Sequence, residues 1–410
     1  MKKKLKRKER VELVPQVNKM KLYDELIWRG LIKDISSKDL EEKLNNDSLT
    51  FYIGTDPTAD SLHVGHLASF ITARRLKDAG HKFILLVGGA TGRVGDPRPT
   101  AERSIIPDDV FAHNLQALKK QVEVFGCDEV VDNYDWSKDI NFIDFLRDFG
   151  KHFPVNYMLD KDTVRRRLEI GITYTEFSYM IMQSLDFLWL YENKNCHMQI
   201  GGSDQWGNLT AGIDLIRKKI GKKAYSFCMP LVTDERGEKI GKSEGNAVWI
   251  DPNKTPSYDL YQYFVKIADE IVIDFLKIFT FLSKEEIEHY EEKVKTNPEK
   301  REAGKRLGFE VVKFLHGEAA AKEAQETAEK VFSGEITENM PTIEVSGESD
   351  ILSILVNSKL VPSKSEARRL VEQGGISVDN EKINDPNTNI EPVEFILQKG
   401  KKTIVKIVVR

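Results

Sequence analysis

The chain has 410 residues, 40% of them hydrophobic and 31% charged, a composition ordinary for a globular protein of more than one domain. Its net charge of −4 excludes a polycation, so a nucleic-acid partner would have to bind at local basic patches. Three widely separated cysteines, with no Cys-x-x-Cys pair, argue against a disulfide framework or a zinc site and indicate reduced thiols.

The first ten residues, Met1 to Arg10, carry seven Lys or Arg. No apolar stretch follows them, which argues against a secretory signal, and we expect a solvated basic tail over residues 1–20. No apolar run in the chain is long enough to cross a bilayer. These features predict a cytoplasmic protein with no membrane contact.

Between residues 21 and 250, helical and strand patterns alternate. Helical spacing of apolar residues runs through 20–46 with a break at a Ser-Ser pair, and a second helix is expected over 67–79. Strands are expected over 49–53, 83–87 and 197–200, and the continuous apolar run of 83–87 is typical of a strand buried on both faces. Residues 111–190 are mainly helical in pattern and read as an insertion. The pattern predicts a doubly wound α/β domain with a parallel sheet.

The remainder of the chain predicts three further segments. Residues 251–332 have a helical pattern, and residues 333–348 are poor in large apolar groups and contain Gly and Pro, as a linker would. Residues 349–410 form a separate small domain. They carry ten basic and eight acidic side chains, so this domain has a net charge of +2, whereas the rest of the chain has −6. A positive net charge suits contact with RNA.

The strongest local signal joins the first strand to the next helix and contains His63-Val-Gly-His66. Histidines three residues apart can face the same direction at the start of a helix, whose positive end favours phosphates. Gly65 has no side chain, so a base or ribose could approach the backbone. The alternatives are two surface histidines at a helix cap or, less well supported, part of a zinc site.

A second signal, Lys239-Ile-Gly-Lys-Ser243, lies in a stretch rich in Gly and charged residues. Two lysines and a hydroxyl on a mobile loop can close over a triphosphate and neutralise charge as pyrophosphate leaves. Taken alone, such a short string is more often a solvated basic turn. The presence of both motifs favours the phosphate-binding interpretation over a solvated turn, because one motif follows the first strand and the other lies well downstream.

H-x-G-H followed by K-x-G-K-S is the two-part signature of the class I aminoacyl-tRNA synthetases. From about Leu22 to the C-terminus the chain resembles that class and, within it, the bacterial tyrosyl-tRNA synthetases. Agreement of several long, ordered strings argues against coincidence. The strings are Asp56-Pro-Thr-Ala-Asp-Ser-Leu-His63, Val87-Gly-Gly-Ala-Thr-Gly92, Tyr174-Thr-Glu-Phe-Ser-Tyr-Met180 and Gln199-Ile-Gly-Gly-Ser-Asp-Gln-Trp-Gly-Asn208.

The resemblance implies a Rossmann-type catalytic domain that activates L-tyrosine with ATP and transfers it to tRNA(Tyr). Spacings of four and three place Tyr179, Gln183 and Asp186 on one face of a helix. By resemblance, Tyr52 and Asp186 hold the phenolic oxygen of tyrosine. The remaining residues implied for the amino acid are Tyr179, Gln183 and Asp96 at its ammonium group and Gln205 near its carboxylate. Without the resemblance, ordinary core aromatics and a surface carboxylate would explain Tyr52, Tyr179 and Asp186.

The same resemblance assigns the nucleotide and its chemistry. The phosphates and the departing pyrophosphate would meet His63, His66, Thr58, Lys239, Lys242 and Ser243. The other residues implied for ATP are Gly54, Asp56, Gly65, Gly202, Asp204 and Arg103. Mg²⁺ is expected to arrive with ATP, with no dedicated protein site. Many relatives carry a lysine as well as an arginine in the loop at 98–103, where this chain has no lysine and Arg98 is the candidate replacement.

The C-terminal segment from Leu360 to Val378 resembles the alpha-L RNA-binding domain, a small α+β module. A serine can cap its helix, and we expect Lys364, Arg368 and Arg369 on that helix to contact phosphates and 2′-hydroxyls. The basic residues alone would suit a solvated helix face equally well. The resemblance further implies a homodimer, with the contact around residues 114–149.

Two other families remain as alternatives. Tryptophanyl-tRNA synthetases share the class and the sheet, but they usually lack the C-terminal domain and the pairing of Tyr52 with Asp186. A non-catalytic RNA-binding relative would keep the fold and lose the chemistry. The intact His63–His66 and Lys239–Ser243 motifs argue against that relative, and only the altered loop at 98–103 favours it.

Overall fold

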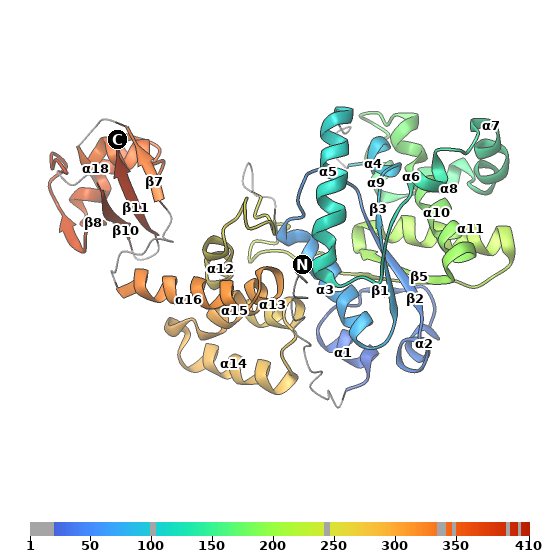
Figure 1. Ribbon diagram of the computed structural model, residues 1–410, viewed down its shortest axis with the longest axis horizontal. Coiled ribbons are helices and arrows are strands. Elements are labelled where there is room, and N and C mark those ends of the chain that lie inside the picture. The colour runs from blue at the N-terminus through green and yellow to red at the C-terminus, as the bar shows by residue number, and fades with distance from the viewer. Residues whose placement is uncertain are drawn as a thin grey trace, which may run out of the picture. The chain divides into compact units, whose positions relative to one another are not determined.

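The computed structural model describes residues 20–98, 104–241, 247–333, 342–346, 350–390, 394–400 and 403–410. The chain divides into two compact units. Unit 1 consists of Met1–Asp251 and Ala268–Pro298, and unit 2 of Pro252–Ile267 and Glu299–Arg410. Figure 1 labels the elements of both units, and each unit is described by itself below.

Unit 1 is built on a sheet that has, among the described residues, six strands in the order β1-β6-β5-β2-β3-β4. All neighbours are parallel except β1, which runs antiparallel to β6. This topology, with helices on both faces, confirms the predicted doubly wound parallel sheet. The strands are β1 (Asp34–Ile35), β2 (Thr50–Thr55), β3 (Lys82–Val87), β4 (Glu129–Asp132), β5 (Cys196–Gly202) and β6 (Tyr225–Met229).

The central strands are apolar on both faces because helices cover both. The first four residues of β2 and the last five of β3 are buried. Phe51 and Phe83 pair in register across these strands, with ring centroids 5.2 Å apart. In Figure 1, α3 and α5 lie to one side of the strands and α10 and α11 to the other. The chain switches sides between β4 and β5, next to β2, which is where a doubly wound sheet places its ligand site.

The helices of unit 1 follow the alternation expected from the sequence. α3 and α10 matter most for the site, since both reach the pocket described below. The helices are α1 (Leu22–Trp28), α2 (Leu40–Asn46), α3 (Val64–Asp78), α4 (Thr91–Val94), α5 (Asp108–Gln121), η1 (Val122–Phe125), α6 (Tyr134–Ser137), α7 (Phe142–Asp144), η2 (Phe145–Phe149), η3 (Gly150–His152), α8 (Val155–Leu159), α9 (Asp162–Arg165), α10 (Tyr174–Lys194), η4 (Ser203–Gln205), α11 (Trp206–Ile220), α13 (Val272–Phe279) and α14 (Lys284–Thr296).

Two sequence expectations for unit 1 need correction. The insertion predicted as mainly helical over 111–190 contains β4, which pairs with β3 and so belongs to the main sheet. Its four residues are too few to show a clear strand period among helical neighbours. The helical segment predicted over 251–332 is also not one body, because Ala268–Pro298 belongs to unit 1, where α13 packs against α3. Helical periodicity cannot tell which neighbour a helix packs on.

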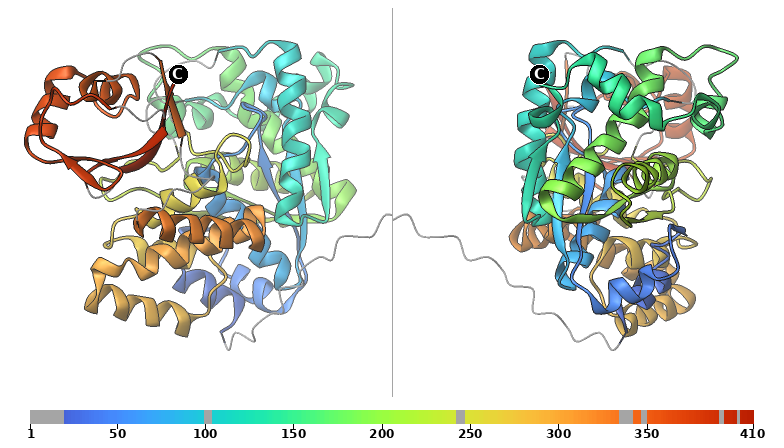
Figure 2. Two further views of the ribbon diagram at one scale, coloured as in Figure 1. Left: turned by 60° about the vertical axis from the view of Figure 1, so that its left-hand side comes forward. Right: turned by 90° about the vertical axis from the view of Figure 1, so that its right-hand side faces the viewer.

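Unit 2 contains helices and a second sheet, and the strands of this sheet are drawn in orange to red in Figures 1 and 2. Its described strands run in the order β7-β11-β10-β8-β9. Its helices are α12 (Ser257–Val265), η5 (Pro298–Lys300, at the boundary of the units), α15 (Glu302–His316), α16 (Glu318–Ser333), α17 (Ile351–Asn357) and α18 (Lys364–Glu372). Its strands are β7 (Thr342–Val345), β8 (Ile376–Val378), β9 (Glu381–Ile383), β10 (Glu394–Lys399) and β11 (Thr403–Val409).

The linker predicted over 333–348 is too long at its C-terminal end. β7 lies within it and pairs in parallel with β11, so residues 342–345 are part of the C-terminal sheet. A four-residue edge strand with one buried residue carries little apolar signal, and its partner lies some sixty residues away along the chain. The other domain boundaries stay predictions.

Candidate active site

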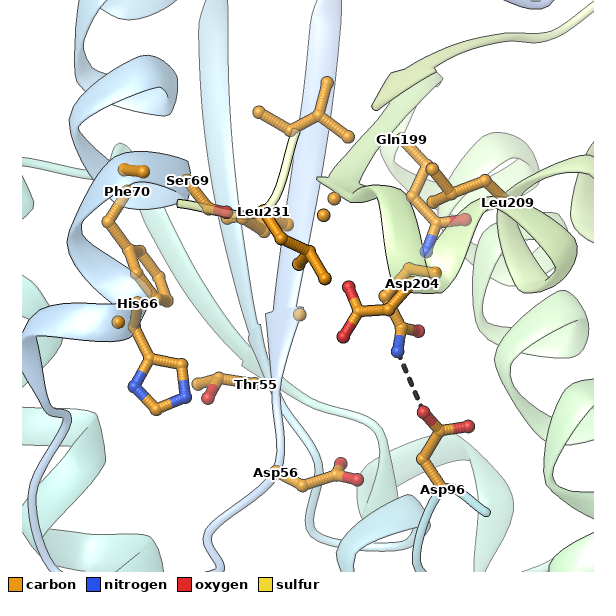
Figure 3. Close-up of a pocket in the computed structure, with 18 of the residues that line it drawn as sticks. Thr55, Asp56, His66, Ser69, Phe70, Asp96, Gln199, Asp204, Leu209 and Leu231 are labelled. Atoms are coloured by element: carbon orange, nitrogen blue, oxygen red, sulfur yellow. Dashed lines mark hydrogen bonds between the residues drawn. The ribbon is translucent and has the colours of Figure 1, made fainter. Parts of the chain in front are cut away.

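A cavity of about 330 Å³ opens at the carboxyl ends of β2 and β5 in unit 1. Figure 3 shows His66 and Ser69 of α3 on one side and Asp204 on the other, with Asp56 and Asp96 at one end. Of the residues that the sequence predicts for a small-molecule site, the cavity wall includes Tyr52, Gly54, Asp56, Thr58, His63, Gly65, His66, Asp96, Tyr179, Gln183, Asp186, Gly202, Asp204, Gln205 and Lys239.

The two histidines form the N-terminal cap of α3. The Nδ1 atom of His63 accepts a hydrogen bond from the backbone N–H of Gly65 at 3.1 Å, and Nδ1 of His66 accepts one from the N–H of His63 at 3.2 Å. The imidazole rings lie 3.9 Å apart between centroids. This reciprocal cap occupies one nitrogen of each ring with backbone, and the helix end provides a positive field for an anion.

The backbone of Gly65 lies directly against the lysine segment. A Cβ atom at this position would lie 2.7 Å from the carbonyl oxygen of Ile240, and one at Gly241 would lie 2.6 Å from the backbone nitrogen of Gly65. Gly241 has a φ of +88°, a conformation that glycine adopts without strain. The glycines of the two sequence motifs therefore allow their backbones to touch, and this contact brings the lysine segment over the start of α3.

Lys239 is the lysine of the second motif that the structure describes. Its Nζ lies 3.3 Å from Oδ2 of Asp204, the residue expected to meet a ribose. Lys242 and Ser243 lie outside the described residues, as does Arg103. Thr58 and Gly54 are exposed on the cavity wall near the end of β2.

Tyr52 and Asp186 both line the cavity, and they are close enough for the charge of Asp186 to contribute to raising the pKa of Tyr52. The hydroxyl of Tyr52 is buried and has no hydrogen-bond partner among the described residues. Both carboxylate oxygens of Asp186 accept a hydrogen bond at 2.9 Å, one from Nδ2 of Asn133 and the other from Nε1 of Trp136. Burial raises the pKa of Asp186 to about 7 despite these two donors, and burial likewise raises the pKa of Tyr52.

Sequence reasoning missed Asn133 and Trp136. Asn133 directly follows β4, so its position at the carboxyl end of a sheet strand would have marked it had that strand been recognised. It also donates to Oγ1 of Thr91 at 2.9 Å and accepts from the backbone N–H of Ala90 at 2.7 Å. These contacts fix the amide that holds Asp186.

A second polar group surrounds Asp96. Oδ2 of Asp96 accepts from Nε2 of Gln205 at 2.8 Å, and Nδ2 of Asn208 lies 3.2 Å from Oδ1 of Asp96 and 3.1 Å from Oε1 of Gln183. Asp96, Gln183 and Gln205 are thus brought together as predicted. Asn208 was quoted only as part of a motif, and the sequence gives no separate signal for its role.

Tyr179 and Asp56 connect this group with β2. The hydroxyl of Tyr179 donates to Oδ2 of Asp56 at 2.8 Å, and Oγ1 of Thr91 donates to Oδ1 of the same carboxylate at 2.8 Å. Burial, and then the charges of Asp56 and Asp96, raise the pKa of Tyr179. Asp56, expected at ATP, therefore hydrogen-bonds to a residue predicted for the amino acid. The carboxylates of Asp56 and Asp96, which both line the cavity, favour a cationic ligand group.

The remaining predicted residues lie in unit 2. Lys364, Arg368 and Arg369 are exposed on α18, whose N-cap Ser363 accepts from the backbone N–H of Glu366 at 3.3 Å. In the part of the chain that the structure describes, no group of three or more His, Cys, Asp or Glu could hold a metal ion. No described helix is long and apolar enough to cross a membrane. All three cysteines are free thiols.

Comparison with known proteins assigns both parts of the chain. Residues 44–333 match the family of class I tRNA synthetases (W and Y), and residues 333–407 match the SYY-like C-terminal domain of tyrosine–tRNA ligases. Tyrosine–tRNA ligase 1 of Bacillus subtilis is 46% identical over 93% of this chain and 97% of its own length. The Pediococcus pentosaceus tyrosine–tRNA ligase is 44% identical over 93% and 98%. A C-terminally truncated mitochondrial tyrosyl-tRNA synthetase from Aspergillus nidulans superposes with a TM-score of 0.68 at 30% identity, covering 76% of this chain and 94% of that structure.

Proposed function

Because the chain belongs to the class I tRNA synthetases of the tryptophan and tyrosine group, and its relatives along nearly its whole length are tyrosine–tRNA ligases, we propose how its pocket performs tyrosine–tRNA ligation. The substrates are L-tyrosine, ATP and tRNA(Tyr). The enzyme forms tyrosyl-adenylate and pyrophosphate, and then transfers the tyrosyl group to the 3′ end of the tRNA.

One observation supports tyrosine as the amino acid. The hydroxyl of Tyr52 is buried without a hydrogen-bond partner among the described residues, and the buried carboxylate of Asp186 lines the same cavity. The phenolic O–H of tyrosine would donate to Asp186, and its oxygen would accept from Tyr52, which has no other partner among the described residues. Phenylalanine would leave the Tyr52 hydroxyl buried without a partner, at a cost of roughly 1–3 kcal/mol, and would give Asp186 no hydrogen bond beyond those from Asn133 and Trp136. The pairing of Tyr52 with Asp186 thus favours tyrosine over phenylalanine and, because a phenol is required, over tryptophan.

The acidic group around Asp96 suits the ammonium end of the amino acid. Asp96, Gln183 and the Tyr179 hydroxyl offer oxygen acceptors, and Asp56 adds a carboxylate that Tyr179 already contacts. Gln205 donates to Asp96 and lies at the edge of this group, where its amide can meet the substrate carboxylate. The two ends of tyrosine are therefore held by separate carboxylates.

The first chemical step needs no general base, since the nucleophile is the ionised carboxylate of tyrosine. One carboxylate oxygen forms a bond to the α-phosphorus of ATP, and the bond from that phosphorus to the oxygen bridging to the β-phosphate breaks. The protein positions the reactants and stabilises the charge that builds on the phosphates. His63, His66 and Thr58 would contact the phosphates, and Lys239, Lys242 and Ser243 would contact the departing pyrophosphate.

The nucleoside would lie across the opening of the cavity. Asp204 and Gly202 would hold the ribose, with Gly54, Asp56, Gly65 and Arg103 completing the ATP site. The ion pair of Lys239 with Asp204 would then have to open when ribose and phosphates bind. Mg²⁺, bound to the ATP phosphates, would neutralise part of their charge.

Three further features are proposed on the same basis. The exposed basic face of α18 (Lys364, Arg368 and Arg369) would bind tRNA(Tyr) outside its acceptor end. The protein would act in the cytoplasm, where relatives of bacterial type meet tRNA.

It would form a homodimer through residues 114–149, and apolar side chains exposed there and beyond support such an interface. These side chains are Tyr134, Phe142, Ile143, Leu146, Val155, Leu168 and Ile170.

The experiment that tests the activity is exchange of labelled pyrophosphate into ATP with tyrosine, phenylalanine and tryptophan side by side. We expect exchange with tyrosine alone, and its loss in Asp186→Ala. Exchange with tryptophan would identify the activity as that of a tryptophanyl-tRNA synthetase. No exchange with any of the three, in folded protein, would refute catalysis and leave RNA binding as its role.

A further inference from the structure

The helical face of α10 that carries the substrate residues continues one turn earlier, to Glu176, which does not itself line the cavity. Glu176 precedes Tyr179, Gln183 and Asp186 at spacings of three, four and three, so all four lie on one helical face. A glutamate in the first turn of a helix is usually exposed to solvent, yet Glu176 is only 1% exposed. Its carboxylate lies 3.0 Å from Nη2 of Arg167, which is 3% exposed.

Arg167 also contacts two other segments of the chain. Its Nη1 donates to the backbone carbonyl of Arg98 at 2.9 Å, and its Nε donates to the carbonyl of Gly171 at 3.0 Å. One planar guanidinium therefore joins the start of α10, the turn that leads into α10, and the segment that follows Asp96. Burial of such a pair costs desolvation energy, so the ion pair need not stabilise the fold. Its contacts suggest a role in positioning instead.

The segment held through Arg98 is short. The ring of Pro97 fixes its own φ and restricts the backbone of Asp96 before it, so the position of Arg98 constrains that of Asp96. The side chain of Asp96 is held from the other side by Gln205 and Asn208. The backbone near Asp96 is thus tied to α10, and its carboxylate to residues at the start of α11.

We propose that Arg167 and Glu176 are positioning residues that set the carboxylate of Asp96 against Tyr179 and Gln183, and so assemble the site for the substrate ammonium group. The inference rests on the proposed function, since it concerns the same amino-acid pocket. Neither residue touches the substrate. Their loss should weaken recognition of the ammonium group and leave recognition of the phenol unchanged.

The variants must separate positioning from folding. The double variant Arg167→Met/Glu176→Met removes both charges together, and apolar replacement of a buried pair is often neutral for stability. Arg167→Lys keeps the buried charge but cannot bridge a carboxylate and two carbonyls with one planar group. Should the double variant fail to fold, Arg167→Lys answers the same question. Arg165→Met is the matched control, because Arg165 lies two residues away and its ion pair with Asp162 is exposed.

Binding of two small phenols to the full-length free enzyme gives the decisive readout. Tyramine has the phenol and the ammonium group, whereas 4-ethylphenol has the phenol alone. In both Arg167 variants we expect tyramine to bind about tenfold or more weaker, the loss typical of a hydrogen bond to a charged group, with 4-ethylphenol unchanged. In pyrophosphate exchange the KM for tyrosine should rise by a similar factor, while Arg165→Met behaves as the wild type.

Two results would overturn the inference. One is an unchanged affinity for both tyramine and 4-ethylphenol in variants that are folded. The other is an equal loss for both phenols, which would mean a general loosening of the pocket. Failure of the wild type to exchange pyrophosphate with tyrosine would instead refute the proposed function, so the two failures are distinguishable.

Discussion

Asp186 is a carboxylic acid that the fold removes from water, and its ionisation should control the choice between tyrosine and phenylalanine. Its pKa is raised to about 7 in the free protein because burial disfavours the charged form. A phenol donates its hydrogen to the ionised carboxylate, so tyrosine binds the ionised form better. Affinity for tyrosine relative to phenylalanine should therefore increase as pH rises towards 7 and level off above it.

The expected change is up to about tenfold per pH unit below the pKa. The measurement is the dissociation constant of each amino acid by competition between pH 5.5 and 8. The ratio of the two constants isolates Asp186, since the ammonium and carboxylate ends are the same in both ligands. A ratio that stays constant over this range would show that Asp186 does not change its charge there.

At the scale of elements, the segment Ala268–Pro298 is held to unit 1 by buried arginines. Arg29 donates to the carbonyls of Lys277 at 2.9 Å and Leu282 at 2.7 Å, and to Oε1 of Glu25 at 2.7 Å. Arg75 of α3 also donates to the Thr280 carbonyl. These contacts explain why α13 packs on α3 instead of joining the helices of unit 2.

Arg29→Met should destabilise unit 1 by about 3 kcal/mol, because it leaves buried carbonyls and Glu25 without their main donor. Arg74→Met is the matched control. Arg74 lies next to Arg75 on α3, but its ion pair with Asp78 is partly exposed, and its loss should cost less than about 1 kcal/mol. Urea denaturation followed by tryptophan fluorescence measures both. Equal midpoints for the two variants would contradict the assignment.

At the scale of the whole molecule, RNA binding by unit 2 should be separable from chemistry in unit 1. Replacing Lys364, Arg368 and Arg369 together by alanine should weaken binding of tRNA(Tyr). It should also reduce the slope of log affinity against log salt by about 2 to 3, one phosphate contact for each side chain. Pyrophosphate exchange, which needs no tRNA, should be unchanged. An unaltered salt slope would exclude this face of α18 from the RNA contact.

The proposed homodimer makes a prediction at the same scale. Phe142→Glu together with Ile143→Glu places two charges on the exposed apolar surface of α7 and should shift the protein to monomers in sedimentation velocity. Ile27→Glu is the control, because Ile27 is also a large exposed apolar residue but lies on α1, outside the proposed contact. A wild type that sediments as a monomer at micromolar concentration would refute the dimer.

The sequence alone determined three central strands of the sheet and indicated both substrate motifs, because these features are local. Apolar strands that end in glycine and histidines at the start of a helix are visible within a dozen residues. Tyr179, Gln183 and Asp186 could be placed on one face since helical spacing fixes that face. The resemblance of several long strings then indicated the family, which the comparisons confirm.

Only the tertiary structure decided which distant side chains meet. Asn133 and Trp136 reach Asp186 from a segment some fifty residues away, and Arg167 reaches the carbonyl of Arg98 across 69 residues. Residues 342–345 became a strand because β11 lies beside them. Local periodicity carries no information about such partners, since a hydrogen bond or a buried ion pair depends on distances that the packed fold alone sets.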